Sequence, residues 1–167
     1  MRLEEITGES IILRPLCEDE AEQVCEWRNQ PELDGLFFRR NISAEEYKRW
    51  LKDVEASANR GIYAIATRDE SKILGTLSFE LQRHTGRESA AEIGIMIGDS
   101  AQRGKGFGAQ AIEILSDYLS GKHGVGEIKV LVFKSNSRAI SFYEKLGFKT
   151  DMLIMSRKTG EAGGQTF

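Results

Sequence analysis

The segment that most constrains the fold is the run Arg-Gly-Lys-Gly-Phe-Gly at residues 103–108, which joins an apolar strand-like stretch to a helical one. Its three glycines lack the Cβ atom that keeps a backbone away from a ligand. The first N–H groups of the helix behind them have no intrahelical partners and carry the positive end of the helix dipole. The run therefore predicts a strand, a tight turn and a helix that together hold a phosphorylated ligand, with a pyrophosphate as the natural guest.

This run matches neither common nucleotide-binding motif. It is not a G-x-G-x-x-G pattern, because its third glycine comes one residue early, and it lacks the Walker sequence G-x-x-x-x-G-K-[ST]. Binding of ATP or NAD is therefore not favoured. A purely structural glycine turn remains as the alternative when the run is taken alone.

A second motif lies downstream at residues 136–148, Asn-Ser-Arg-Ala-Ile-Ser-Phe-Tyr-Glu-Lys-Leu-Gly-Phe. It predicts a short helix with Asn136 near the N-cap and Gly147 at the C-terminal stop. The residues expected on one face of this helix are Ala139, Phe142, Tyr143 and Leu146.

The two motifs, R-x-x-G-x-G followed by N-x-x-A-x-x-x-Y-x-x-x-G-F, resemble the GNAT superfamily of acetyl-CoA-dependent N-acetyltransferases. The resemblance is strongest over residues 92–148 and includes Leu13-Arg14-Pro15-Leu16 and Trp27-Arg28-Asn29 nearer the N-terminus. Trp27-Arg28-Asn29, followed by Pro31-Glu32, is similar to the branch that acetylates amino-sugar nucleotides and the N-termini of ribosomal proteins. A packing role for Trp27 is the equal alternative.

Hydrophobic patterning predicts strands over residues 10–16, 62–67, 73–79, 91–97, 128–133 and 148–155, the first of them at a sheet edge because it ends at Pro15. It predicts helices over residues 18–28, from the Ser43 capping box to about Ala58, and over residues 107–120. The fold class is therefore α/β (α+β), a mixed sheet with helices on both faces. The resemblance implies a mostly antiparallel central sheet that splays between its fourth and fifth strands.

The resemblance also implies where the acyl donor lies. Acetyl-CoA is the expected co-substrate, with its pyrophosphate on the backbone amides of residues 103–108 and with Arg103 and Lys105 adding charge. Its pantetheine arm would pair with the exposed backbone of residues 95–97 as an added strand does. The residues expected to contact the donor are Ile95, Met96, Ile97, Arg103, Gly104, Lys105, Gly106, Phe107, Gly108, Asn136 and Phe142.

Two residues are candidates for proton transfer. Tyr143 occupies the motif position from which a hydroxyl protonates the departing thiolate, although a helical Tyr is more often a core aromatic. Glu92, at the start of the strand leading to the donor site, is the candidate general base. Glu80, His84 and water are the alternatives.

The expected function is transfer of an acetyl group to a primary amine by direct attack. The alternative is a catalytically weak or inactive acyl-CoA-binding module of the same fold. Acceptor specificity is expected in the first half of the chain, where the loop Phe37-Phe38-Arg39-Arg40 either lines the acceptor pocket or leads into the capped helix. A small-molecule amine, an amino-sugar nucleotide or a peptide N-terminus are the acceptor classes, and the family makes a homodimer plausible.

Composition bounds the remaining possibilities. A length of 167 residues fits a single domain over residues 1–158 with a flexible tail over 159–167. With a net charge of −3, the chain lacks the positive field that would attract nucleic acids or anionic membranes. Cys17 and Cys25 are more consistent with reduced, buried thiols than with a disulfide, and two cysteines with two separated histidines form no metal site. The first residues contain no secretory signal, so a cytoplasmic location is expected.

Overall fold

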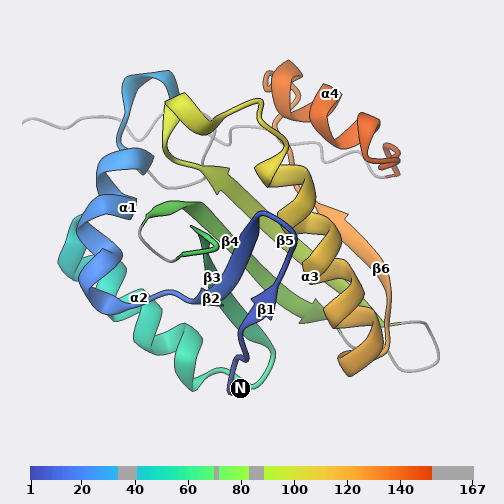
Figure 1. Cartoon of the computed structure of the whole chain (residues 1–167), viewed down its shortest axis with the longest axis horizontal. Helices are drawn as coiled ribbons and strands as arrows, with labels where there is room; N and C mark the ends of the chain where they lie inside the picture. The colour runs from blue at the N-terminus through green and yellow to red at the C-terminus, as the bar shows by residue number, and fades with distance from the viewer. Residues whose placement is uncertain (34–40, 70–71, 83–88, 152–167) are drawn as a thin grey trace, which may run out of the picture.

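The computed structural model describes residues 1–33, 41–69, 72–82 and 89–151 (Figure 1). A six-stranded sheet in the order β1-β2-β3-β4-β5-β6 forms its centre. All neighbouring strands pair antiparallel except β5 and β6, which are parallel. The strands are β1 (Ile6–Thr7), β2 (Ile11–Pro15), β3 (Arg60–Thr67), β4 (Ile73–Gln82), β5 (Ser89–Ile97) and β6 (Val125–Val130).

The antiparallel meander predicted for the middle of the chain is confirmed, since β3, β4 and β5 pair in sequence order. One expectation about this sheet is wrong. The strand containing Pro15 is not at an edge, because the short strand β1 pairs with β2 on its other side through Ile6 and Leu13. Strand β1 has only two residues, which is too short for an alternating hydrophobic pattern, so the sequence gives no sign of this pairing.

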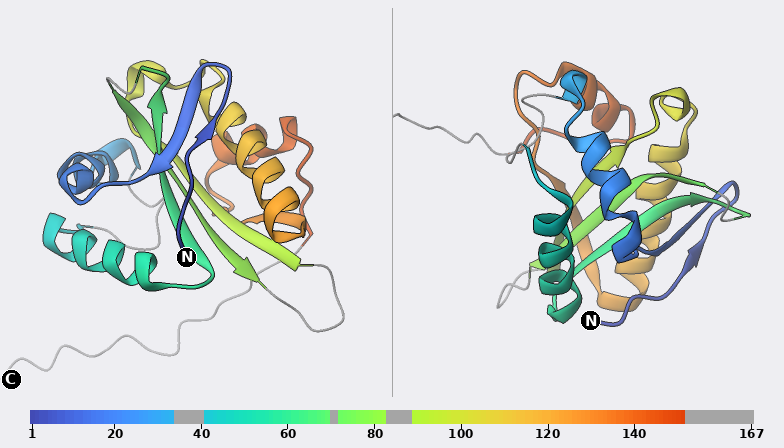
Figure 2. Two further views of the ribbon diagram at one scale, coloured as in Figure 1. Left: turned by 60° about the horizontal axis from the view of Figure 1, so that its bottom comes forward. Right: turned by 90° about the vertical axis from the view of Figure 1, so that its left-hand side faces the viewer.

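Helices cover both faces of the sheet, as Figure 2 shows. On one face lie α1 (Ala21–Arg28), preceded by a 3₁₀ turn at Glu18–Glu20, and α2 (Ala44–Ala56). On the other face lie α3 (Phe107–His123) and α4 (Ser137–Lys145). The α/β class and the two-sided arrangement predicted from the sequence are therefore confirmed.

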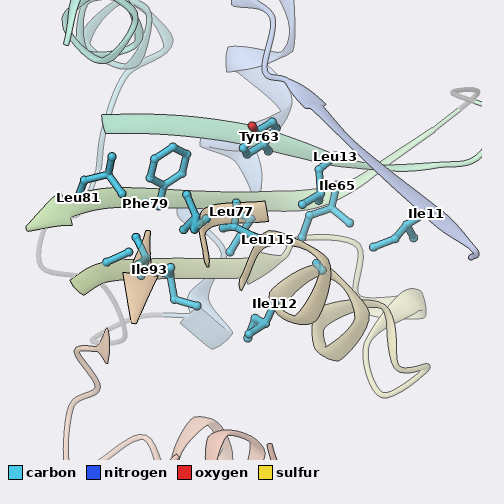
Figure 3. Packing of buried hydrophobic residues seen from close by; sticks show 14 of the residues in the cluster. Ile11, Leu13, Tyr63, Ile65, Leu77, Phe79, Leu81, Ile93, Ile112 and Leu115 are labelled. Carbon is cyan, nitrogen blue, oxygen red and sulfur yellow. The ribbon is translucent and has the colours of Figure 1, made fainter. Parts of the chain in front are cut away.

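Each face has its own hydrophobic cluster because side chains of successive strand residues point to opposite sides. Ile93 of β5 packs with Leu77 of β4 and Leu115 of α3, and Figure 3 shows strand side chains directed at this helix. On the opposite face Met96 packs with Val24 of α1 and Leu51 of α2. A fully buried Leu or Ile contributes about 1.5–3 kcal/mol, so the two clusters hold both helical layers to the sheet.

The capping box predicted at Ser43 is present. The Glu46 N–H donates to Ser43 Oγ at 3.2 Å, and the Ser43 N–H donates to Glu46 Oε2 at 3.0 Å. These two bonds satisfy donors that the first turn of α2 would otherwise leave unpaired. The helix ends at Ala56, so Ala58, which was expected to continue its apolar face, lies beyond it and is exposed.

Strand β6 begins and ends three residues earlier than the predicted strand 128–133. The reason is its pairing with β5, which covers Ser89 to Ile93 and ends at Val130, while β5 itself continues to Ile97. The two strands therefore diverge beyond this point, which is the splay expected between the fourth and fifth strands predicted from the sequence. Leu131 and Phe133, expected in a strand, are instead 47% and 36% exposed.

Several expectations fall outside the described residues. These are His84, the loop Phe37-Phe38-Arg39-Arg40, the later part of the strand expected over 148–155 and the tail 159–167. Residues 148–151, which are described, are not in a strand. Across the described segments, no helix combines the length and apolar character needed to cross a membrane.

Candidate active site at the end of strand β5

The glycine run forms the loop between β5 and α3. Gly104 and Gly106 have φ values of 80° and 88°, a left-handed conformation that residues with a Cβ rarely adopt. Gly106 is the N-cap of α3, and within the described residues no side chain caps this helix. The N–H groups of the first helical turn are therefore left to an external partner, as expected for an anion site.

Gly108 marks the point where three elements converge. A Cβ atom placed on Gly108 would lie 3.5 Å from Phe142 Cζ of α4, 3.6 Å from Ile95 Cδ1 and 3.7 Å from Ile97 Cγ1 of β5. The first turn of α3, the end of β5 and the middle of α4 thus meet around one buried glycine. The two sequence motifs, predicted to serve one ligand, are adjacent in space.

The end of β5 presents an open backbone edge. In the described part of the chain, residues 94–97 have no partner on the β6 side. The Gly98 N–H donates to Leu74 O of β4 at 2.9 Å, so this N–H points to β4. Because such groups alternate in direction along a strand, those of Ile95 and Ile97 point to the opening. This edge is suited to pairing with an extended, amide-containing ligand.

Arg103 is directed at the end of β5 and at Gln30, which follows α1. Its Nε donates to Ile97 O at 2.9 Å, and its Nη2 lies 3.1 Å from Gly98 O and 3.2 Å from Gln30 Oε1. Lys105, two residues later, is exposed, with its Nζ 3.1 Å from Gln102 Oε1. Of the two cations expected at the phosphate site, Lys105 is therefore the one on the surface of the loop.

Tyr143 lies on α4, and its side chain belongs to the hydrophobic cluster that also contains Leu115 of α3 and Ile93 of β5. It is 9% exposed, and its ring lies 5.2 Å from the ring of Phe142 and 5.4 Å from that of Phe148, measured between centroids. Burial raises the pKa of Tyr143 to about 12. The hydroxyl therefore stays protonated at neutral pH and can act as a proton donor.

Asn136 has the capping role that the sequence predicts. Its Oδ1 accepts a hydrogen bond from the Ala139 N–H at 3.1 Å and so starts α4. This bond fixes the carboxamide at the end of α4 and uses its oxygen, which leaves the Nδ2 group as the donor toward a ligand.

Glu92 lies on the face of the sheet opposite Tyr143. It is beside Glu80 of β4 and Lys129 of β6 in the strand register, and Arg60 of β3 extends the row on the far side of Glu80. Gln82 Nε2 lies 3.4 Å from Glu92 Oε2, and Arg60 Nε lies 3.9 Å from Glu80 Oε2. Glu92 and Glu80, the two candidate bases that the structure describes, are thus neighbours in one row of charged residues next to the splay.

Comparison with known proteins decides the family. Residues 10–149 match the family described as "Acetyltransferase (GNAT) domain". This chain belongs to the GNAT acetyltransferase family. Membership supports acyl-CoA-dependent N-acetyltransferase activity in general and explains why the open edge of β5, the glycine loop and α4 occur together.

Three relatives illustrate the range of the GNAT similarity. The uncharacterized N-acetyltransferase p20 of Bacillus licheniformis is 24% identical over 157 residues, covering 91% of this chain and 86% of p20. Glucosamine-6-phosphate N-acetyltransferase from Arabidopsis thaliana has a TM-score of 0.65 and 22% identity, covering 91% of this chain and all (100%) of the other. Aminoglycoside acetyltransferase AAC(6')-Ib in complex with coenzyme A has a TM-score of 0.71 and 22% identity, covering 85% and 86% of the two chains.

In this GNAT domain Trp27 has the packing role that the sequence left open. It is 7% exposed, and a Cβ atom on Gly98 would lie only 1.9 Å from its Cδ2 atom. The indole therefore lies directly on the turn that follows β5. Beside it is an open groove of about 470 Å³, whose lining includes Gln23, Gln30 and the Lys72–Asp99 ion pair.

Gln30 is the site residue that sequence reasoning missed. It follows α1 and contacts Arg103, which is 73 positions away in the sequence. A single Gln after a helix belongs to no motif, so only the folded structure reveals this contact.

The cysteines are poor candidates for a covalent intermediate. Cys25 is buried in α1 and Cys17 is exposed before it, and both are unpaired. Burial raises the pKa of both thiols, which lowers the fraction of reactive thiolate. Among the residues that the structure describes, no three His, Cys, Asp or Glu side chains are grouped to hold a metal ion.

Proposed function

We propose that this GNAT protein transfers an acetyl group from acetyl-CoA to a primary amine by direct attack. The observation that carries the proposal is the convergence at Gly108 of the open β5 edge, the uncapped N-terminus of α3 and the Phe142–Tyr143 pair of α4. An acyl donor with a pyrophosphate and an amide-containing arm matches the first two features. The residues proposed to contact it are Ile95, Met96, Ile97, Gly104, Lys105, Gly106, Phe107, Gly108, Asn136 and Phe142. The expected contact from Arg103 is not included, because its guanidinium bonds to Ile97, Gly98 and Gln30.

In the proposed step the amine nitrogen attacks the thioester carbonyl and the C–S bond breaks. Tyr143 Oη gives its proton to the departing thiolate, and the proton lost by the attacking nitrogen is taken by Glu92 or by water. The two proton-transfer residues lie on opposite faces of β5, which suits an acyl carbon placed between a donor side and an acceptor side. A backbone N–H at the open edge, such as that of Ile97, polarises the carbonyl.

For the acceptor we propose amines of the kinds named by the structural relatives and by the sequence resemblance. Amino sugars, aminoglycosides and peptide N-termini are all primary amines, and amino-sugar nucleotides add a phosphate. A net charge of −3 is compatible with a cationic acceptor.

The first experiment is calorimetric titration with acetyl-CoA and, separately, with CoA, ATP and NAD. Selective binding of acetyl-CoA and CoA, followed by release of CoA when amines are added, would support the proposal. Binding without turnover across the amine classes would favour an acyl-CoA-binding module. Absence of acetyl-CoA binding would overturn both.

A further inference from the structure

The side chain of Arg103 makes contacts that a phosphate-binding residue would not need. Its guanidinium donates to two consecutive backbone carbonyls, those of Ile97 and Gly98, and to the side chain of Gln30. Ile97 is the last residue of β5, Gly98 follows it, and Gln30 lies just after α1. Each of these bonds involves a charged donor and is therefore stronger than a bond between neutral groups.

The Ile97 carbonyl has a particular place on β5. The backbone groups of Ile95 and Ile97 point to the opening between β5 and β6, because backbone N–H groups alternate in direction along a strand and that of Gly98 points to β4. Arg103 Nε occupies the last carbonyl of this open edge. The Ile95 N–H and C=O and the Ile97 N–H remain directed at the opening, so Arg103 defines where the edge available to a ligand ends.

The turn after β5 is held from both sides. From the β4 side, Leu74 O accepts bonds from the N–H groups of Gly98 and Asp99, and Lys72 pairs with Asp99. From the opposite side, Arg103 bonds to the carbonyls. Residues 97–99 are therefore fixed between β4 and the first residue of the phosphate loop.

Gln30 connects this turn to the other half of the molecule. It lies just after α1, and its Oε1 accepts from Arg103 Nη2 at 3.2 Å. Helix α1 belongs to the layer in which acceptor specificity is expected, whereas Arg103 starts the loop of the donor site. One side chain thus links the donor loop, the edge of β5 and the helix α1.

We propose that Arg103 is a positioning residue that sets the geometry of the β5 edge and is not a ligand of the donor phosphates. The proposal rests on the proposed function for the identity of the donor. The phosphates are held by the backbone amides of residues 104–108 and by Lys105. Gln30 is the partner that aligns the guanidinium with the two carbonyls.

The test compares Arg103→Lys with the unaltered protein, using acetyl-CoA and S-acetyl-pantetheine, which lacks the phosphates. Lysine keeps the positive charge and can still bind phosphate, but it cannot bridge two carbonyls and Gln30 as the planar guanidinium does. We expect Arg103→Lys to weaken binding of both probes by a similar factor, about tenfold. Retained affinity for both probes, or a loss confined to acetyl-CoA, would overturn the proposal.

A readout without any ligand separates this proposal from the proposed function. Hydrogen exchange of the Gly98 and Asp99 amides, which bond to Leu74 O, should be faster in Arg103→Lys, and faster to a lesser degree in Gln30→Ala, which removes one of the three bonds and serves if the first variant does not fold. Unchanged exchange in both variants contradicts a positioning role. A protein that binds no acetyl-CoA yet shows the faster exchange would fail the proposed function while keeping the role of Arg103 in the fold.

Two matched variants complete the design. Lys105→Ala should weaken acetyl-CoA binding and leave S-acetyl-pantetheine binding unchanged, which is the pattern of a phosphate ligand. Arg49→Ala, which removes an exposed arginine of α2, should change neither binding constant nor the exchange rates. If Lys105→Ala and Arg103→Lys gave the same pattern, Arg103 would be a phosphate ligand after all.

Discussion

At the scale of single residues, Tyr143 combines burial with a place at the meeting point of the two motifs. Its pKa is raised to about 12 by burial, so the phenol is neutral throughout the working range and holds the proton that a thiolate needs. We expect Tyr143→Phe to lower kcat by about tenfold to a hundredfold, because the packing ring is kept and the proton is lost. Steady-state kinetics at saturating substrate measure this effect.

The pH dependence provides the control for Tyr143. Because its pKa lies near 12, ionisation of this phenol should cause no loss of kcat below about pH 10. The unaltered enzyme and Tyr143→Phe should therefore have kcat profiles of the same shape that differ only in height. Equal kcat values for the two proteins would exclude the proton-donor role.

Glu92 is tested against its neighbour in the same row of charges. If Glu92 is the general base, Glu92→Gln should lower kcat/KM on the order of a hundredfold and remove the fall in rate that protonation of a carboxylate causes at acid pH. Glu80→Gln, at the adjacent position of β4, is the matched variant and should keep that fall. An unchanged pH profile in Glu92→Gln would assign the proton transfer to water or to another group.

Gly106 and Gly108, at the start of α3, differ in whether they tolerate a Cβ atom. Gly106 has a φ of 88°, so an alanine there is strained by about 1–2 kcal/mol although no atom lies within 4 Å of its Cβ. Gly108 has space for a Cβ at ordinary contact distances, and alanine favours a helix by about 0.5–1 kcal/mol. Gly106→Ala should therefore lower the free energy of unfolding and Gly108→Ala should not, as denaturant unfolding of the ligand-free protein can show.

At the scale of elements, an ion pair joins β2 to the turn before α1. Arg14 donates to both carboxylate oxygens of Glu20, at 3.0 and 2.6 Å, and the Cys17 N–H also donates to this carboxylate. Burial alone would raise the pKa of Glu20, but the hydrogen bonds and the charge of Arg14 outweigh it and lower the pKa. The carboxylate therefore contributes stability above its unfolded-state pKa, which is lost as pH falls through the lower folded-state value.

Glu20→Gln isolates this contribution. We expect the variant to be less stable at neutral pH by about 1–3 kcal/mol, because Arg14 loses its anionic partner and an amide offers one acceptor oxygen in place of two. The difference should shrink at acid pH, where the native carboxylate is itself protonated. Urea unfolding at several pH values measures it, and a difference independent of pH would mean that the charge of Glu20 is not involved.

Elements with strong local patterns could be predicted from the sequence. Three examples are the Ser43 capping box, the meander of β3 to β5 and the glycine turn before α3. Each could be predicted because its signal lies within a few consecutive residues. The predicted end of β6 is wrong, because the strand ends where β5 and β6 diverge and not where the hydrophobic pattern ends. The bonds of Arg103 to β5 and Gln30 were also unpredictable, because they join segments brought together only by folding.

At the scale of the whole molecule, the turn after β5 is in contact with α1 on one side and with the loop before α3 on the other. Trp27 of α1 lies against Gly98, and a Cβ atom there would come within 1.9 Å of Cδ2 and 2.1 Å of Cε3 of the indole. The backbone of the turn is held in place by hydrogen bonds with Arg103 and Leu74. The position of α1 relative to the donor loop is therefore set by the absence of a side chain at residue 98.

Gly98→Ala should force α1 away from the sheet and lower the free energy of unfolding by about 1–3 kcal/mol, the usual cost of overpacking. Gly121→Ala is the control, because a Cβ atom there meets nothing within 4 Å. Trp27→Ala alone should cost about 3–5 kcal/mol through the cavity it leaves. In the double variant the new methyl group has no indole to strike, so its cost should be less than the sum of the single costs. Additive costs within a few tenths of a kcal/mol would show that the contact between Trp27 and Gly98 does not set the position of α1.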